Sequence, residues 1–427
     1  MDSNQTIMNN RPGSTRRWTV LLGGFLLSAM GGMSYAWGSF VIPLVNDWGW
    51  TVAEATLPLT ILIVVFALMM IPAGWLQDRI GPRKIALAGA VLFLVGYGLA
   101  SLLRYITTHT WLIATYGLLV GSACGLTYAC IAPVARKWYP DRPGFAVSTA
   151  VMGFGLAAVV FAPLKKVMIR AWGVDGALLV LGVFVFAVAL AGALLMRNPP
   201  DGWIPPPKQG SAAKAVAARR YSNQDIPPGQ FIRMPVFYGL WAALAAVIGG
   251  GLTAIGLLTP FGEIQLHLSP TEAAMAVSVF SLVNGIGRPL AGYCGDRFGA
   301  NRVMIVVYSV QAVVFLAMPW VVNSYPLLLL SALLLGAGYA VTFALFPVLV
   351  AAGFGTRHLG TNYGLVFSAF GIGALTGYIG SMLLDRTGSF TPAFLLAGTT
   401  TLIGLVLLIM LHKSLDTSLP KSDSPLK

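Results

Sequence analysis

The chemistry that the sequence offers centres on one arginine inside an apolar segment. Arg288 lies in the stretch 278–302, with no other charged residue among the ten before it and the seven after it. In a membrane helix its guanidinium would lie roughly 12 Å from the charges at Asp296 and Arg297, at about 1.5 Å of rise per residue. An arginine at that depth costs at least ~2.5 kcal/mol and normally faces the protein interior or a water-filled cavity. Arg288 is therefore predicted to bind an anionic ligand; the alternative is a structural pair with a carbonyl or a carboxylate.

Asn284 lies four residues before Arg288, so both side chains project from one face of a helix. A guanidinium presents a fork of donors that matches a carboxylate, and an amide can add another donor. Tyrosines in the middle of a span must find a hydrogen-bond partner away from water, which favours a cavity over plain packing. The further candidates for this site are Tyr35, Ser39, Tyr128, Tyr339, Phe343 and Phe367, with Asn362 and Tyr363 nearby in the sequence.

The composition predicts an all-α polytopic membrane protein. Charged residues make up 10% of the chain, against about 25% in soluble domains, and apolar residues make up 57%. With about 20 residues per span, the apolar runs divide into twelve transmembrane helices. The predicted spans are about 18–44, 53–76, 84–105, 111–136, 144–168, 174–196, 234–261, 272–295, 302–322, 326–351, 359–384 and 391–412.

The net charge of +13 reflects membrane topology rather than nucleic-acid binding. If both termini are cytoplasmic, 21 of the 27 Lys and Arg residues fall in cytoplasmic segments, five outside and one, Arg288, within a span. The outside group includes Lys165, Lys166 and Arg170. This asymmetry follows the positive-inside rule and predicts a multi-pass protein of a bacterial-type cell (inner) membrane with both ends in the cytoplasm. The first apolar run is interpreted as a retained helix, because it is too long for a signal-peptide core.

Cysteine and histidine positions argue against a metal site, a cofactor or catalysis. Cys124, Cys130 and Cys294 all lie in apolar runs, which suits packing better than disulfides or metal ligation. The four histidines lie near span ends or in loops, so they cannot form a catalytic cluster in mid-membrane. We therefore predict no enzyme activity, no cofactor and no metal.

The chain contains an internal duplication. Glycine, aspartate, arginine, glycine and a final cation in 74–84 recur in 292–302, at a constant offset of 218 residues, about half of the chain. The predicted organisation is two pseudo-symmetric six-helix halves, 18–196 and 234–412. A polar arm (1–17), a proline-rich cytoplasmic linker (197–233) and a polar tail (413–427) complete the chain.

The duplicated loop resembles the cytoplasmic motif of the major facilitator superfamily, and the twelve spans extend this resemblance over essentially the whole chain. The resemblance implies a gating role for Asp78 and Asp296, each capping or pairing near the end of a neighbouring helix. A carboxylate near a helix N-terminus gains ~0.3–1 kcal/mol and can also pair with a nearby arginine. Arg79, Arg297 and Arg142 are assigned to the same conformational group. The residue equivalent to Arg288 in the first half is Met70, so the fold itself does not require a cation there.

A narrower resemblance is to the monocarboxylate transporter family and its bacterial relatives, including oxalate/formate exchangers. It rests on Asn284-Gly-Ile-Gly-Arg288-Pro289, Tyr35-Ala-Trp-Gly, the run 136–144, Tyr339 with Phe346-Pro347, and Asn362-Tyr363-Gly364. The resemblance implies a secondary transporter of small carboxylates such as lactate and pyruvate, with the anion on Arg288 and a proton as the coupled ion.

At three positions this chain differs from the families that it resembles. Animal members have an Asp at the position of Asn284 and a Lys where this chain has Ser39, and oxalate/formate exchangers have a Lys at the position of Phe370. A single buried cation suits a monoanion, because a dicarboxylate would bring a second charge without a partner. With no acid beside Arg288, the candidate proton carriers are Asp296 and Glu263, both distant from it in the sequence pattern.

The leading hypothesis is therefore monocarboxylate transport by alternating access, coupled to protons. The alternatives are oxalate/formate-type antiport and, in a different class, a membrane carboxylate sensor that does not transport.

Overall fold

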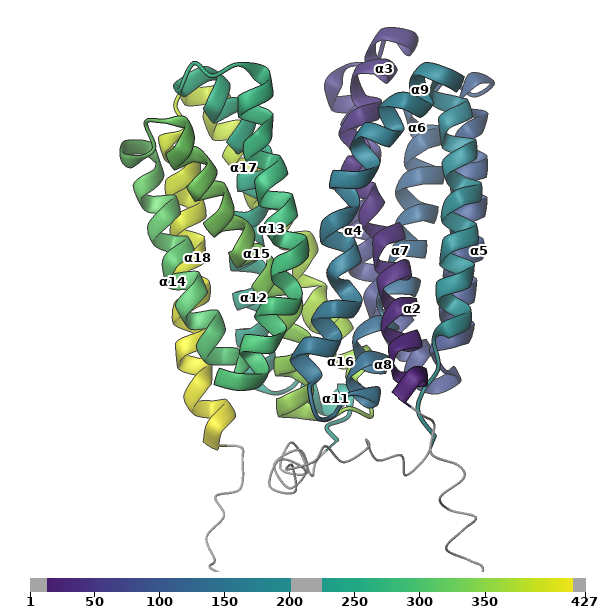
Figure 1. The fold of residues 1–427 in the computed structure, drawn as a ribbon, viewed down its shortest axis with the longest axis vertical. Coiled ribbons are helices and arrows are strands. Elements are labelled where there is room, and N and C mark those ends of the chain that lie inside the picture. Colours follow the sequence, from purple (N-terminus) through teal and green to yellow (C-terminus); the bar gives the residue numbers. More distant parts are fainter. Residues whose placement is uncertain (1–13, 201–224, 418–427) are drawn as a thin grey trace, which may run out of the picture.

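The computed structural model describes residues 14–200 and 225–417, and within these ranges all regular structure is helical (Figure 1). The predicted linker and tail lie largely outside these residues, as does most of the predicted polar arm. In Figure 1 the helices form two groups side by side, with the start of α2 and the end of α18 at the same, lower end of the bundle. We call this end the termini end.

Among the residues that the structure describes, eleven helices are long and apolar enough to cross a membrane. One of them, α9 (Pro143–Leu195), has 53 residues and is interrupted at Gly173, whose φ of 70° breaks the helical path. The stretches on either side of Gly173 each exceed the ~20 residues that a span needs. Because α9 supplies two spans, the predicted all-α fold with twelve spans is confirmed.

The first half consists of α2 to α9. Its elements are α2 (Ser14–Gly32), η1 (Met33–Trp37), α3 (Gly38–Trp48), α4 (Val52–Ile80), α5 (Pro82–Ala100), η2 (Ser101–Arg104), α6 (His109–Leu112), η3 (Ile113–Val120), α7 (Gly121–Tyr128), α8 (Ile131–Trp138) and α9. The first span is thus two α-helices joined by the 3-10 turn η1, and Ala36 in that turn leaves the helical region of φ and ψ. Tyr35 lies within this break.

The second half follows the short helix α11 (Pro228–Phe231). Its elements are α12 (Pro235–Pro260), η4 (Phe261–Gln265), α13 (Pro270–Phe298), α14 (Ala300–Val321), α15 (Tyr325–Phe354), α16 (Leu359–Phe367), α17 (Ala369–Thr387) and α18 (Thr391–Thr417).

The duplication extends to both ends of the equivalent helices α4 and α13. Each begins with a capping box, Thr51 with Glu54 in α4 and Ser269 with Glu272 in α13, again at an offset of 218 residues. Each ends at a glycine with φ of 92°, a conformation that residues with a side chain rarely adopt. The two halves therefore repeat the start and stop signals of these helices as well as the loop motif.

At the termini end the two halves meet in a close seam. Helix α4 packs against α16, and α13 packs against α9. A Cβ atom at Gly74 would overlap the backbone of Gly360, and one at Gly292 would overlap the backbone of Gly144. Glycine at these positions thus lets helices of opposite halves approach to backbone contact.

The two motif aspartates join the same seam across the halves. Asp78 accepts hydrogen bonds from the amides of Gly360 (3.3 Å) and Thr361 (2.8 Å) at the start of α16. Asp296 accepts bonds from the amides of Gly144 (2.7 Å) and Phe145 (2.8 Å) at the start of α9. Each carboxylate therefore meets the N-terminus of a helix from the other half, where free amides and the helix dipole favour negative charge.

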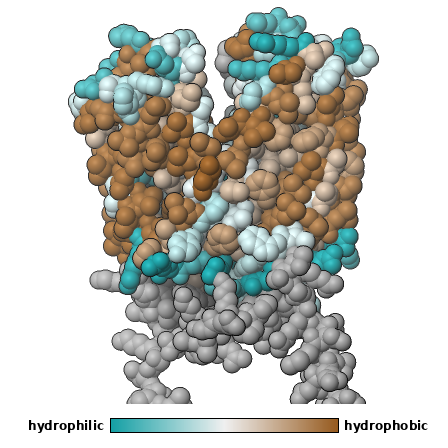
Figure 2. All heavy atoms as spheres, in the orientation of Figure 1, coloured by the Kyte–Doolittle hydropathy of each residue, from teal (hydrophilic) through white to brown (hydrophobic). Residues whose placement is uncertain are grey.

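At the opposite end the halves diverge. Figure 2 shows a notch between them above a broad hydrophobic band. A cavity of about 600 Å³ lies between the halves, lined by residues of both. The structure is thus closed at the termini end and open at the opposite end.

Gly292→Leu should prevent this closed seam, because its side chain would have to displace the backbone of Gly144. The probe is a cysteine in place of Ser281, which lines the cavity, in protein whose three native cysteines are replaced by serine. Its reactivity reports whether the cavity is open. We expect Ser281→Cys to react more slowly with a membrane-impermeant maleimide from the open end when Gly292→Leu is present. Gly256→Leu is the control, since a Cβ at Gly256 meets nothing within 4 Å. Equal labelling in folded Gly292→Leu would contradict the proposed closeness of the seam.

Candidate binding site between the two halves

Arg288 of α13 is fully buried and hydrogen-bonded to neutral acceptors. Its Nε and Nη2 donate to the Oδ1 of Asn284, at 3.3 and 3.2 Å. Its Nη1 donates to the carbonyl oxygen of Val151, at 2.8 Å, on α9 of the other half. The guanidinium therefore bridges the two halves, and no ion pair neutralises it among the described residues.

One face of the guanidinium rests on an aromatic cluster. The Arg288 Cζ lies 4.7 Å from the centroid of the Phe343 ring, a cation–π geometry. Phe343 contacts Phe367 and Phe370, and those two rings stack with their centroids 5.4 Å apart. Phe370 is completely buried. Phe370 thus belongs to the apolar wall beside Arg288.

Three predicted tyrosines converge on Arg288 from three different spans. Tyr35 comes from η1, Tyr128 from α7 and Tyr339 from α15, and each lies within electrostatic reach of Arg288. Their hydroxyls are buried, and none makes a hydrogen bond of normal geometry with the described protein. A buried polar group without a partner costs about 1–3 kcal/mol. The hydroxyls of Tyr35 and Tyr339 lie beside each other and that of Tyr128 lies beside Arg288, so hydroxyls and a cation cluster where an anionic acceptor could meet them.

The cavity between the halves lies above this site. Of the predicted residues, Tyr35 and Ser39 line it, together with Ser281, one turn from Asn284 on α13. The hydroxyl of Ser39 donates to the Ala162 carbonyl at 3.2 Å. Arg288 is not part of the lining, and it lies enclosed beneath the cavity in this conformation.

Two lysines were placed wrongly by the sequence analysis. Lys165 and Lys166 were assigned to the outside face, but both lie within the continuous helix α9. Lys165 is fully buried; its Nζ donates to the Met33 carbonyl at 2.9 Å and lies 5.2 Å from the centroid of the Phe40 ring. Lys166 lines the cavity. Arg288 is therefore not the only cation inside the bundle, and the signal that was missed is that the predicted span 144–168 already contained both lysines.

The arginines grouped with the motif aspartates make other contacts. The Arg79 guanidinium lies over the Trp75 ring, 4.0 Å from its centroid, and Arg297 Nη1 donates to the Tyr293 hydroxyl at 3.4 Å. Arg142 is exposed at the residue before α9. No ion pair within the described ranges joins either aspartate to these arginines. The expectation of arginine pairing is thus wrong in this conformation, whereas both aspartates do lie at helix N-termini.

Other predicted polar residues lie away from Arg288. Asn362 donates from Nδ2 to the Ile226 carbonyl at 3.0 Å, and so fastens the end of the central linker to α16. Glu263 is exposed in η4, at the open end of the bundle. Neither candidate proton carrier, Asp296 or Glu263, is therefore brought next to the buried guanidinium.

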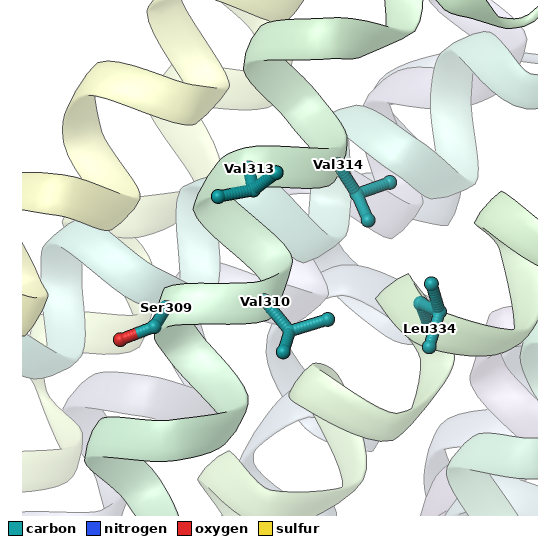
Figure 3. A pocket seen from close by; sticks show the side chains of 5 residues that line it. All are labelled: Ser309, Val310, Val313, Val314 and Leu334. Carbon is teal, nitrogen blue, oxygen red and sulfur yellow. The ribbon is translucent and has the colours of Figure 1, made fainter.

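A second recess, of about 380 Å³, lies between α14 and α15 (Figure 3). Its lining is Ser309, Val310, Val313, Val314 and Leu334. The one hydroxyl there already donates to the Ile305 carbonyl. Without a charged group, this recess does not suit a carboxylate.

The sequence profile described as the Major Facilitator Superfamily matches residues 20–265 and 254–426. The chain belongs to the major facilitator superfamily. The predicted resemblance is thereby confirmed, and the protein is a membrane transporter of this superfamily.

Two curated relatives are similar to the chain over most of its length. The oxalate:formate antiporter of Oxalobacter formigenes is 26% identical over 394 residues, covering 92% of this chain and 90% of that protein. Monocarboxylate transporter 13 of Bos taurus is 28% identical over 419 residues, covering 95% and 91%.

Solved structures agree with the fold. The superfamily transporter FucP, in an outward conformation, matches with a TM-score of 0.69 at 16% identity, over 92% of this chain and 97% of its own. The proton:xylose symporter XylE matches with a TM-score of 0.70 at 14% identity, over 94% and 95%.

Proposed function

We propose that the protein carries small monocarboxylates such as lactate or pyruvate across the cell membrane by alternating access. The observation that carries this proposal is the arrangement around Arg288. A buried guanidinium, bonded only to neutral groups and accompanied by three buried tyrosine hydroxyls, lies between the two halves. A carboxylate would supply a negative charge and enough lone pairs for these donors.

The names of the relatives support the same substrate class. One is an oxalate:formate antiporter and the other a monocarboxylate transporter, and both names denote small carboxylates. Oxalate/formate-type antiport is the second candidate, favoured by the match over 92% of this chain. The apolar surroundings of Phe370 favour the monoanion, because a second buried carboxylate would lack a cation.

The seam supports an alternating-access cycle. We assign the termini end to the cytoplasm, because most Lys and Arg residues lie in segments on that side. Asp78 and Asp296 then close the cytoplasmic gate, and Arg79, Arg297 and Arg142 lie at its edge. A carboxylate bound to Arg288 would compete with the Val151 carbonyl, which belongs to the other half, and so would act on the contact between the halves.

Arg288→Gln should abolish lactate counterflow in proteoliposomes, because glutamine keeps a polar donor but removes the charge and the fork. Asn284→Ala should weaken transport less, since one neutral hydrogen bond contributes about 0.5–1.5 kcal/mol. The matched control is Arg302→Gln, which removes an exposed cation from the following helix. Unchanged counterflow in folded Arg288→Gln would contradict the assignment of Arg288 as the binding residue. Lactate binding without counterflow in the native protein would favour a sensor.

Phe370→Lys should shift selectivity toward dicarboxylates. The new ammonium would replace a ring that contacts Phe343, directly beside the face of Arg288. Competition of oxalate against labelled lactate measures the shift, with Ile372→Lys, on the exposed side of α17, as the control for adding a charge. If oxalate competes as poorly as in the native protein, charge does not set the selectivity.

We propose that proton coupling depends on the negative charge of the substrate, which neutralises Arg288. An empty buried cation resists a closed and dry intermediate, while the neutralised pair permits it. We therefore expect lactate exchange to be faster than net uptake, and an inward proton gradient to drive accumulation. Loss of the proton effect in Asp296→Asn or Glu263→Gln alone would identify that residue as the carrier. Accumulation driven by sodium and insensitive to pH would refute proton symport.

A further inference from the structure

We infer that Lys166, together with the Ser281 hydroxyl, forms an outer subsite that captures a carboxylate before it reaches Arg288. This inference rests on the proposed function and concerns the path to the buried site. It gives a role to a cation that the sequence analysis had placed outside the bundle.

The position of Lys166 in the cavity is the first observation. Polar side chains reach the cavity from both halves, and Lys166 is the only charged residue in its lining. Among the described residues no carboxylate forms an ion pair with it. An unpaired ammonium in a concave, partly apolar space concentrates anions, because low-dielectric walls focus its field.

The neighbouring residue explains why Lys166 points into the cavity. Lys165 is held by the Met33 carbonyl and the Phe40 ring, which fixes the rotation of α9 about its axis. Consecutive residues of an α-helix project about 100° apart, at 3.6 residues per turn. With Lys165 directed into the first half, Lys166 is directed along the cavity wall.

Ser281 supplies a hydroxyl on the facing helix. It lines the cavity from α13 and lies three residues before Asn284 and seven before Arg288, on the same helical face. The neighbouring Ser278 already donates its hydroxyl to the Ala274 carbonyl, whereas no such bond engages Ser281 within the described structure. Ser281 thus marks the beginning of a polar path that descends α13 to the buried site.

The distance along this path separates the two subsites. Seven residues from Ser281 to Arg288 correspond to about 10 Å of helix. A carboxylate with three carbons is shorter than this, so one that contacts the Ser281 hydroxyl at the cavity has not yet reached the level of Arg288. Lys166 therefore acts on capture, and Arg288 on the bound state.

The test compares initial lactate uptake by native protein and Lys166→Gln in proteoliposomes. We expect the KM to rise roughly two- to fivefold at low ionic strength with Vmax unchanged, the size typical of one solvent-exposed charge. The difference should shrink as salt is added, because screening shortens the reach of the charge. Lys166→Arg should retain the native KM. Arg170→Gln removes an exposed cation from the same helix outside the lining and should leave the KM unchanged.

A second measurement needs no transport. In protein whose native cysteines are replaced by serine, Ser281→Cys should react faster with an anionic than with a cationic methanethiosulfonate reagent. Lys166→Gln should abolish that preference, whereas Arg170→Gln should preserve it. An unchanged preference in Lys166→Gln, or an equal loss in both variants, overturns the outer subsite even if lactate proves not to be the substrate. Failure of the proposed function would instead be the absence of lactate counterflow in the native protein.

Discussion

The structure depends on a guanidinium that is buried without a counter-ion. Arg288 is held by the Asn284 amide oxygen, the Val151 carbonyl and the Phe343 ring, none of which carries a full negative charge. An aspartate at position 284 would neutralise the cation and compete with an incoming anion. The neutral amide orients the guanidinium but leaves its charge uncompensated. A bound anion would therefore stabilise the buried cation.

The uncompensated charge of Arg288 lies where the two halves touch. Asn284 and Phe343 belong to the second half, but Val151 belongs to the first. Near the termini the two halves are joined by two aspartates, one between α13 and α9 and one between α4 and α16, and by glycines that permit backbone contact. The aspartate and glycine contacts of the seam are duplicated, whereas the cation proposed to bind the ligand is not, because position 70 holds methionine. Such an arrangement suits a transporter, since moving between conformations needs balanced contacts at the gate and a ligand needs a single asymmetric site.

Most of the fold was predictable because lipid imposes simple rules. Low charge, long apolar runs and the offset of 218 residues were sufficient for twelve spans in two halves, and the helical spacing placed Asn284 beside Arg288. The hydrogen bond from Arg288 to the Val151 carbonyl could not be predicted. Every residue has a backbone carbonyl, and the sequence does not show which of them a side chain contacts. Asn362 was misjudged because its partner, Ile226, lies at the end of the linker, which no periodicity places. Lys165 and Lys166 were counted with the outside cations although the predicted span 144–168 contains both, and the helix continues to Gly173.

The buried Lys165 shows why that assignment is wrong. The first span is broken at η1, where Ala36 departs from helical geometry, and Lys165 donates to the carbonyl of Met33 at the start of this break. Methionine in place of Lys165 would fill similar space but would withdraw that hydrogen bond from a buried carbonyl, a cost of about 1–3 kcal/mol. Met33 and Tyr35 belong to the same short turn, so a lysine outside the binding site helps to hold the segment that carries Tyr35. The hydrogen bond of Lys165 thus serves the fold, whereas Lys166 lines the cavity between the halves and Arg288 lies enclosed beneath it.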